Sequence, residues 1–391
     1  MKRRQFIYKT LGLSLGLNAL NLACAPTQNH QITSGQFFKT KKHKGRWMLI
    51  NPKGEPFWSI GLNHVDAATL RQLNSGKIWA EKYDNSMEKW LKSVQKDLTD
   101  WGFNTLGWNQ ELVTFNAQNK HHSRSFTYEE YQWLDMPYCH LLPFIESHQW
   151  ETETRLPDIR SKGFAEWCDY VARDQCARMK DDPNLIGYFF TDCPTWVHHR
   201  TDNAWKAPLF DPDKLKSSAG KKDLFDLAST YYRVITESIK RYDSNHLILG
   251  DRYEAMQPLP EAVIKAALPY VDVFSFQCFA ATNTIGEKLQ RWANFTNKPI
   301  LLADSATWLP TKTKGWPPKE DRHINAIEYG NILETLSQNP NCIGFHLCGA
   351  YLRNKVRRYG LKDATDELDE STVAIKKINL HHQKWVKSTL N

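Results

Sequence analysis

The sequence of 391 residues lacks the motifs that bind nucleotides and structural zinc. No Gly-x-Gly-x-x-Gly follows an apolar run and no Gly-Lys-Ser/Thr loop occurs, so nucleotide-binding α/β folds lose their signature. The eight cysteines form no Cys-x-x-Cys pair and no Cys/His cluster with zinc spacing. We therefore expect no cofactor and no metal, and we expect the cysteines beyond residue 24 to be buried small hydrophobes.

The sequence also has few long apolar runs and only a small excess of charge of one sign. Hydrophobic residues make up 41% of the chain, enough for a core but too little for a protein that crosses a membrane repeatedly. The formal charge is +8, but four basic residues lie among the first nine, which leaves 47 basic against 43 acidic side chains. This balance argues against a nucleic-acid-binding domain, which needs a concentrated basic face. It is compatible with an anionic glycan as partner.

Residues 1–23 contain no acidic side chain and have the organisation of an export signal. An Arg-Arg pair is followed by a short apolar stretch that ends just before Cys24. The segment resembles a twin-arginine signal, and Cys24 resembles a lipoprotein processing site. We expect a protein of the periplasm or cell envelope, in contact with the membrane only through a lipid anchor at Cys24.

After a polar linker at residues 24–42, short apolar runs alternate with amphipathic stretches. Helical spacing is clearest in residues 222–242, and it recurs in 163–180, 284–295 and 324–338. Apolar strands alternating with helices indicate a parallel sheet covered by helices, and eight repeats favour an α/β fold of the (β/α)8 TIM-barrel type in one domain, residues 43–391. The eight runs are residues 57–63, 103–109, 138–145, 185–192, 247–253, 271–279, 299–307 and 342–351.

Barrels of this type carry their chemistry at the carboxyl ends of the strands. Acids, amides and tryptophans dominate those positions here. Acids can move protons, amides can hold hydroxyl groups, and Trp faces can stack on sugar rings, so the list predicts a glycoside-binding mouth. The candidate substrate-binding residues are Asn63, His64, Trp108, Asn109, Cys193, Trp196, Asp251, Arg252, Glu254, Gln277, Trp308 and His346.

Asp192 and Asp304 are the candidate catalytic residues, because each ends an apolar run. Apolar walls favour a raised pKa, which a general acid needs. Alternatively, either Asp caps a helix or pairs with an arginine such as Arg252, and Asp251 could form an ion pair with the same arginine. Ordinary structural roles also remain open for the strand-end histidines, asparagines and tryptophans.

Three segments resemble agarase-type glycoside hydrolases, family 50 and its relatives among the clan A barrels. Gly45–Asn63 resembles the opening of those enzymes, Phe103–Trp108 their second strand and Asp182–Phe189 their fourth. The resemblance spans about residues 43–350. It implies a retaining hydrolase of marine galactans such as agar or porphyran, with an acid/base on strand four and a nucleophile on strand seven.

The chain departs from that family at both catalytic positions. The family's strand four ends Asp-Asn-Glu with a Trp three places later, whereas here Asp192 falls on the Asn and Cys193 on the Glu. Asp304 replaces the strand-seven Glu. A thiol is a poor donor to a glycosidic oxygen, so either Asp192 has taken over as the acid or the activity is altered or lost. Two shorter carboxylates favour an inverting arrangement with an intervening water.

Three functions remain open from the sequence. The first is an exported glycoside hydrolase that acts on a polysaccharide or oligosaccharide through two carboxylates. The second is a non-catalytic carbohydrate-binding lipoprotein on a degenerate barrel. The third, an oxidoreductase or lyase on the same barrel, is disfavoured by the missing cofactor motifs.

Overall fold

The computed structural model describes residues 36–71, 76–111, 124–145, 158–199, 208–307, 323–353 and 359–389. All of them lie within one compact unit, residues 34–391. The predicted export signal, Cys24 and Trp308 lie outside the described residues. Among the described residues, no helix is both long and apolar enough to cross a membrane.

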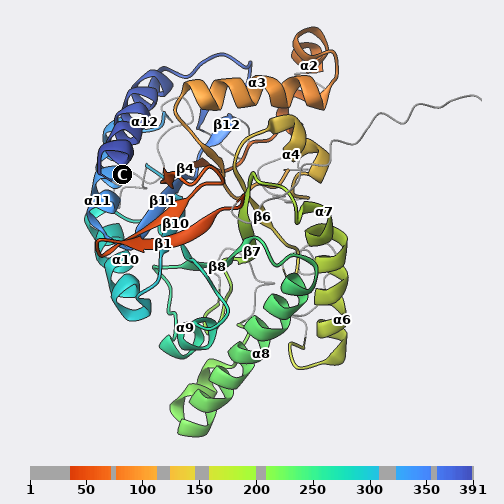
Figure 1. The fold of residues 1–391 in the computed structure, drawn as a ribbon, viewed down its shortest axis with the longest axis vertical. Coiled ribbons are helices and arrows are strands. Elements are labelled where there is room, and N and C mark those ends of the chain that lie inside the picture. Colours follow the sequence, from red (N-terminus) through yellow and green to blue (C-terminus); the bar gives the residue numbers. More distant parts are fainter. Residues whose placement is uncertain are drawn as a thin grey trace, which may run out of the picture. The chain divides into compact units, whose positions relative to one another are not determined.

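Eight parallel strands form a closed barrel, which confirms the predicted TIM-barrel fold (Figure 1). Each predicted run overlaps one of them, and β8 extends one residue beyond its run. Their apolar sequences explain why nearly every strand residue is buried, since helices cover the outside and side chains fill the inside. In barrel order the strands are β4 (Ser59–Leu62), β5 (Thr105–Leu106), β6 (Tyr138–Leu141), β7 (Leu185–Asp192), β8 (Leu247–Glu254), β9 (Phe274–Gln277), β10 (Ile300–Ser305) and β11 (Cys342–Leu347), which pairs with β4.

Amphipathic helices surround the barrel (Figure 1). In α3, for example, Trp90, Leu91, Val94 and Leu98 are buried at helical spacing, and Ser86 caps the first turn by accepting from the backbone N–H of Lys89. The longer helices are α3 (Met87–Asp100), α6 (Lys162–Val171), α8 (Ser218–Tyr242), α10 (Thr282–Thr296), α11 (Ala326–Gln338) and α12 (Glu370–Thr389). The shorter ones are α1 (Ala68–Arg71), α2 (Gly76–Tyr83), α4 (Tyr128–Leu134), α7 (Ala177–Met179) and α9 (Glu261–Ala267).

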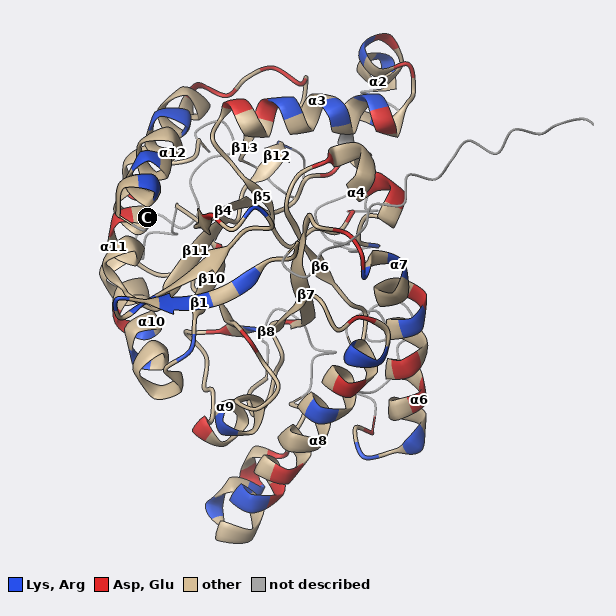
Figure 2. Cartoon of the chain, in the orientation of Figure 1, with Lys and Arg blue, Asp and Glu red and all other residues tan. Residues whose placement is uncertain are grey.

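The four predicted helices are confirmed, with one interruption. The helix expected at 163–180 contains a π-helical turn, Ala172–Cys176, between α6 and α7. A 3-10 turn, Pro212–Lys216, precedes α8. Lys, Arg, Asp and Glu are interspersed along the outer helices α3, α6 and α8 (Figure 2), and several form pairs four residues apart, such as Lys92 with Glu88.

A small antiparallel sheet closes the end of the barrel where the strands begin. It consists of β1 (Lys39–His43), β2 (Arg46–Ile50) and β3 (Pro56–Phe57). Phe38 and Leu49 pack in the cluster that fills the barrel interior, and Trp47 N–H donates to the Pro340 carbonyl at 2.7 Å. The predicted linker, residues 24–42, was therefore too long at its end, because residues 39–42 belong to β1. This sheet leaves the carboxyl ends of the strands as the barrel's mouth.

The seven cysteines beyond Cys24 are all buried and unbridged, as expected. Two further strands, β12 (Ala350–Leu352) and β13 (Gly360–Lys362), pair in parallel after the last barrel strand. They place the backbone of Tyr351 beside His64, whose carbonyl accepts from the Tyr351 N–H at 3.3 Å.

Candidate active site

Strands β7 to β10 bring five predicted residues together at the barrel mouth. Asp192 ends β7 opposite Arg252 of β8, and Glu254 of β8 lies opposite Gln277, which ends β9. Gln277 in turn lies opposite Asp304 of β10. Parallel strands of one barrel end at the same edge, so this register gathers side chains that are far apart in the sequence.

Arg252 connects the two candidate catalytic carboxylates. Its Nε donates to Asp192 Oδ1 at 2.6 Å, its Nη2 contacts the same oxygen, and Nη2 lies 3.6 Å from Asp304 Oδ2. The residue is only 2% exposed, and its guanidinium lies over the Trp108 ring, 4.6 Å from the centroid. Burial alone lowers the pKa of Arg252, but the charges of Asp192 and Asp304 more than reverse this, and the net shift is upward.

This arrangement bears on the expected chemistry in two ways. Because both carboxylates contact Nη2, their contacting oxygens are at most about 6 Å apart, shorter than the separation of roughly 6.5–9.5 Å that inverting enzymes keep. A neighbouring guanidinium also favours the ionised form of a carboxylate. The separation of these two oxygens is thus closer to that of retaining enzymes than to the inverting arrangement expected from two shorter side chains.

Asparagine side chains line the mouth beside Asp304. Asn63 Nδ2 donates to Asp304 Oδ1 at 2.7 Å and to the Ala303 carbonyl at 2.9 Å. Asn63 Oδ1, both amide atoms of Asn109 and Arg252 Nη1 are buried without a hydrogen-bond partner in the described part of the chain. Buried polar atoms are rarely left unpaired. Four such atoms from three residues predicted to bind substrate are therefore a reason to expect a polar ligand here.

Cys193 falls where the resemblance to agarase-type enzymes places their catalytic Glu. Its side chain contacts the carboxylate of the preceding residue, Asp192. Its Sγ donates to Asp192 Oδ1 at 3.1 Å, and its N–H donates to the Arg252 carbonyl at 3.1 Å. Its φ of +50° lies in the left-handed region, which non-glycine residues adopt seldom. The thiol therefore adds a weak hydrogen bond to a carboxylate that Arg252 already holds.

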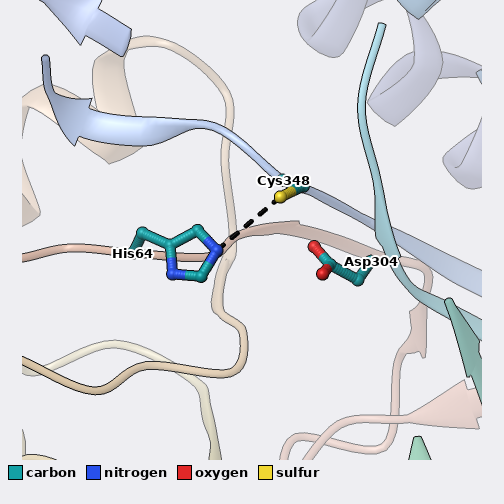
Figure 3. A group of neighbouring side chains, drawn as sticks. All are labelled: His64, Asp304 and Cys348. Carbon is teal, nitrogen blue, oxygen red and sulfur yellow. Dashed lines mark hydrogen bonds between the residues drawn. The ribbon is translucent and has the colours of Figure 1, made fainter. Parts of the chain in front are cut away.

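His64 lies close to Asp304, with Cys348 beside both (Figure 3). Its Nε2 is 3.7 Å from Cys348 Sγ, and its ring meets Trp108 edge-on with centroids 5.2 Å apart. The Asp304 carboxylate points toward this pair in Figure 3. Cys348 was predicted only as a buried hydrophobe, since a lone cysteine after strand eight gives no sequence signal.

His346 lies inside the barrel. Its Nε2 is 2.8 Å from Ser59 Oγ, and it is fully buried. Burial, with a smaller contribution from the Arg252 charge, lowers the pKa of His346 to about 3, so the ring is neutral at ordinary pH. This placement supports the structural alternative for His346.

Asp251 points away from the mouth, toward α8. Its carboxylate accepts from the hydroxyls of Tyr231 at 2.8 Å and Tyr232 at 2.7 Å, and it is fully buried. Successive strand residues face opposite sides, so Arg252 points inward where Asp251 points outward. The ion pair considered between Asp251 and Arg252 does not form, and the arginine pairs with Asp192 instead.

The tryptophans differ in their surroundings. Trp196 is fully buried and packs against Tyr231 and Tyr232, with centroids 5.4 and 6.0 Å away. Core packing, rather than an open stacking face, describes Trp196. Trp108 carries Arg252 on its face and is also buried.

A second polar group lies around Glu254. Gln277 Nε2 donates to Glu254 Oε1 at 2.9 Å, and His198 Nε2 lies 3.4 Å from Glu254 Oε2. His198 was not predicted as a site residue, because its only sequence signal is the pair His198-His199 shortly after strand four. Glu254 is thus a mouth carboxylate in contact with an amide and a histidine.

No protein-family model matches the sequence. β-Agarase B of a Vibrio species is 22% identical over 422 aligned positions, which cover 79% of this chain and 43% of that protein. The chain thus spans less than half the length of this relative. The crystal structure of the agarase AgWH50C superposes with a TM-score of 0.65 at 17% identity, over 90% of this chain and 64% of that one. The structure of an exo-β-agarase superposes with a TM-score of 0.65 at 15% identity, over 92% of this chain and 66% of that one. These comparisons confirm that the chain resembles agarase-type glycoside hydrolases and has the fold of their barrel.

Proposed function

We propose that this protein is an exported glycoside hydrolase that cleaves an agar-like galactan. The observation that carries the proposal is the Asp192–Arg252–Asp304 group, next to buried amide and guanidinium atoms that have no hydrogen-bond partner among the described residues. Two carboxylates and a set of hydroxyl-binding groups are what glycoside hydrolysis requires. The detectable similarity to a β-agarase supports agar or a related galactan as substrate.

Asp304 is assigned the nucleophile. The Asn63 hydrogen bond and the nearby Arg252 charge both stabilise its carboxylate form, which is the form that attacks the anomeric carbon. Attack forms a glycosyl ester on Asp304 while the bond to the leaving oxygen breaks. Water then hydrolyses the ester and regenerates the carboxylate.

The proton for the leaving oxygen comes from a second carboxyl group, and two residues compete for this role. Asp192, assigned from the sequence, is held by two nitrogens of Arg252, which favours its ionised form. Glu254 is the second candidate, because it ends the neighbouring strand β8 at the same edge of the barrel and contacts Gln277 and His198 there. An aryl galactoside with a good leaving group needs little protonation, so the donor variant, Asp192→Asn or Glu254→Gln, will keep turnover on it while losing galactan cleavage.

Residues 1–23 and Cys24 are proposed to export the protein and to anchor it by a lipid. The support is the Arg-Arg signal and the cysteine that follows the apolar stretch. Fractionation of expressing cells tests this: Cys24→Ala should move the protein from the membrane fraction to the soluble periplasmic fraction. Recovery of both forms in the same fraction would contradict the anchor.

Product analysis distinguishes a hydrolase from a protein that only binds carbohydrate. Agar, porphyran and carrageenan are incubated with the purified protein, and reducing ends and oligosaccharide masses are followed. New reducing ends from one of these galactans support the hydrolase. Saturable glycan binding without products would favour the non-catalytic alternative, which the ion pairing of Asp192 and the cysteine at position 193 also make plausible.

A further inference from the structure

The ends of three neighbouring strands place a nitrogen, an oxygen and a sulfur ligand together. Barrel order runs β10, β11, β4, and Asp304, Cys348 and His64 lie in or directly after these strands. One ligand atom from each residue lies within 4.8 Å of the other two, and all three side chains are buried (Figure 3). The sequence could not reveal this set, because its members are separated by 240 and 44 positions.

The spacing matches what a tetrahedral zinc ion needs. With Zn–S of about 2.3 Å and Zn–N of about 2.0 Å, a tetrahedral angle separates the two ligand atoms by roughly 3.6 Å. The observed Cys348 Sγ to His64 Nε2 distance is 3.7 Å. The site is therefore close to metal-binding geometry before any ion is considered.

The backbone holds two of the ligands in place. His64 has a φ of +60°, its N–H donates to the Trp108 carbonyl, and its carbonyl accepts from Tyr351. The Cys348 N–H donates to the Ser305 carbonyl at 2.8 Å, and its own carbonyl accepts from the Tyr359 hydroxyl. Asn63 orients the third ligand through its bond to Asp304. Ligands fixed in this way lose little freedom when they bind an ion.

A divalent ion at this group would also balance the charges of the neighbouring side chains. Asp192 and Asp304 carry two negative charges against the single positive charge of Arg252. Binding a divalent ion releases the Cys348 thiol proton to solvent and adds a thiolate, so three negative charges then face three positive ones. A soft thiolate with an imidazole and a carboxylate selects zinc over magnesium or calcium.

We propose that His64, Asp304 and Cys348 form a zinc site and that zinc bound there inhibits the enzyme, because it occupies the carboxylate that would attack the sugar. The inhibitory part rests on the proposed function, whereas the metal site does not. A tetrahedral zinc ion held by these three residues has a fourth coordination position for water or another ligand.

Cobalt(II) tests the site without any activity measurement. The full chain is freed of metal with a chelator and titrated with Co²⁺, whose bond to a thiolate gives a near-ultraviolet charge-transfer band. We expect one equivalent to produce the band and Zn²⁺ to abolish it. Cys348→Ser should lose the band, while Cys342→Ser, at the other end of the same strand, should keep it.

His64→Asn provides a second ligand variant, since Asn tolerates a positive φ. It should weaken Co²⁺ binding at least about tenfold. Thermal unfolding and circular dichroism show whether each variant is folded. A folded wild type without the band, or a Cys348→Ser variant that keeps it, would overturn the metal site.

Inhibition is measured separately on the hydrolysed galactan. Zn²⁺ should inhibit the wild type and Cys342→Ser but not Cys348→Ser. A charge-transfer band with no zinc inhibition would overturn the blocking of Asp304. If no glycan is hydrolysed even without metal, the proposed function fails together with the inhibition, while the band still decides whether the metal site exists.

Discussion

Arg252 and Asp192 face each other from adjacent strands at the barrel mouth, joined by a hydrogen bond of 2.6 Å from Nε to Oδ1. The same guanidinium reaches toward Asp304, so one buried cation lies between the buried Asp304 and the partly buried Asp192. Without it, two like charges at most about 6 Å apart would repel each other in a poorly solvated site. Arg252 thereby allows both acids to be ionised together.

Removing that cation should destabilise the fold. Arg252→Met removes the cation between the buried Asp304 and the partly buried Asp192, and we expect a loss of about 3 kcal/mol in the free energy of unfolding. Urea denaturation at neutral pH measures it. Arg233→Met is the control, because Arg233 forms an exposed pair with Glu237 and should cost less than about 1 kcal/mol. Equal losses in both variants would contradict a special role for Arg252.

The buried His140 should lower the free energy of unfolding as the pH falls. Burial lowers the pKa of His140 to about 4, despite its hydrogen bond with Gln175. The unfolded chain, with a pKa of about 6.5, then binds more protons than the folded chain between these values, so stability declines as pH falls below about 6.5. His140→Gln should lose less stability between pH 7 and pH 5 than the wild type does, by on the order of 2 kcal/mol. Urea denaturation at both pH values measures this, and identical losses would contradict the assignment.

Gly107 should tolerate no side chain. A Cβ there would lie 2.1 Å from Asn63 Oδ1 and 2.8 Å from His346 Nδ1. Gly107→Ala therefore has to displace the side chain that holds Asp304, and kcat on a hydrolysed galactan should fall more than about tenfold. Gly330→Ala in α11 meets only ordinary contacts and should leave kcat unchanged. A Gly107→Ala enzyme with wild-type kcat would show that Asn63 does not position the nucleophile.

Asp251 should matter for stability rather than for turnover. Asp251→Asn weakens the charged acceptor of the Tyr231 and Tyr232 hydroxyls, and a cost of about 1–3 kcal/mol is expected. Because the side chain faces α8, kcat per folded molecule should stay within about threefold of wild type. Unfolding curves and active-site-normalised kinetics measure the two quantities. A large kcat loss in a stable variant would place Asp251 in the site after all.

The barrel was predictable because most of its strands lie in largely apolar runs, as in Leu185–Asp192. Strand β1 was missed because Lys39–His43 is polar and mostly exposed, which an edge strand allows and a propensity pattern does not reveal. Within the site, the sequence located the strand ends but not the direction of each side chain. Asp251 and Arg252 are neighbours in sequence, yet they serve opposite faces of the barrel wall.

The His64–Asp304–Cys348 group was beyond sequence reasoning for another reason. Its members have no characteristic spacing, because parallel barrel strands bring together positions separated by whole helices. Strand order makes such residues neighbours only once the barrel closes and β11 pairs with β4.

The central claim is that Asp304 attacks the sugar. The most direct test is peptide mass mapping after the protein reacts with a 2-deoxy-2-fluoro galactoside bearing a good leaving group, which slows hydrolysis of the glycosyl ester. The account predicts one glycosyl group on the peptide that contains Asp304, at Asp304 itself. A label on another residue, or no label while galactan is being cleaved, would contradict it.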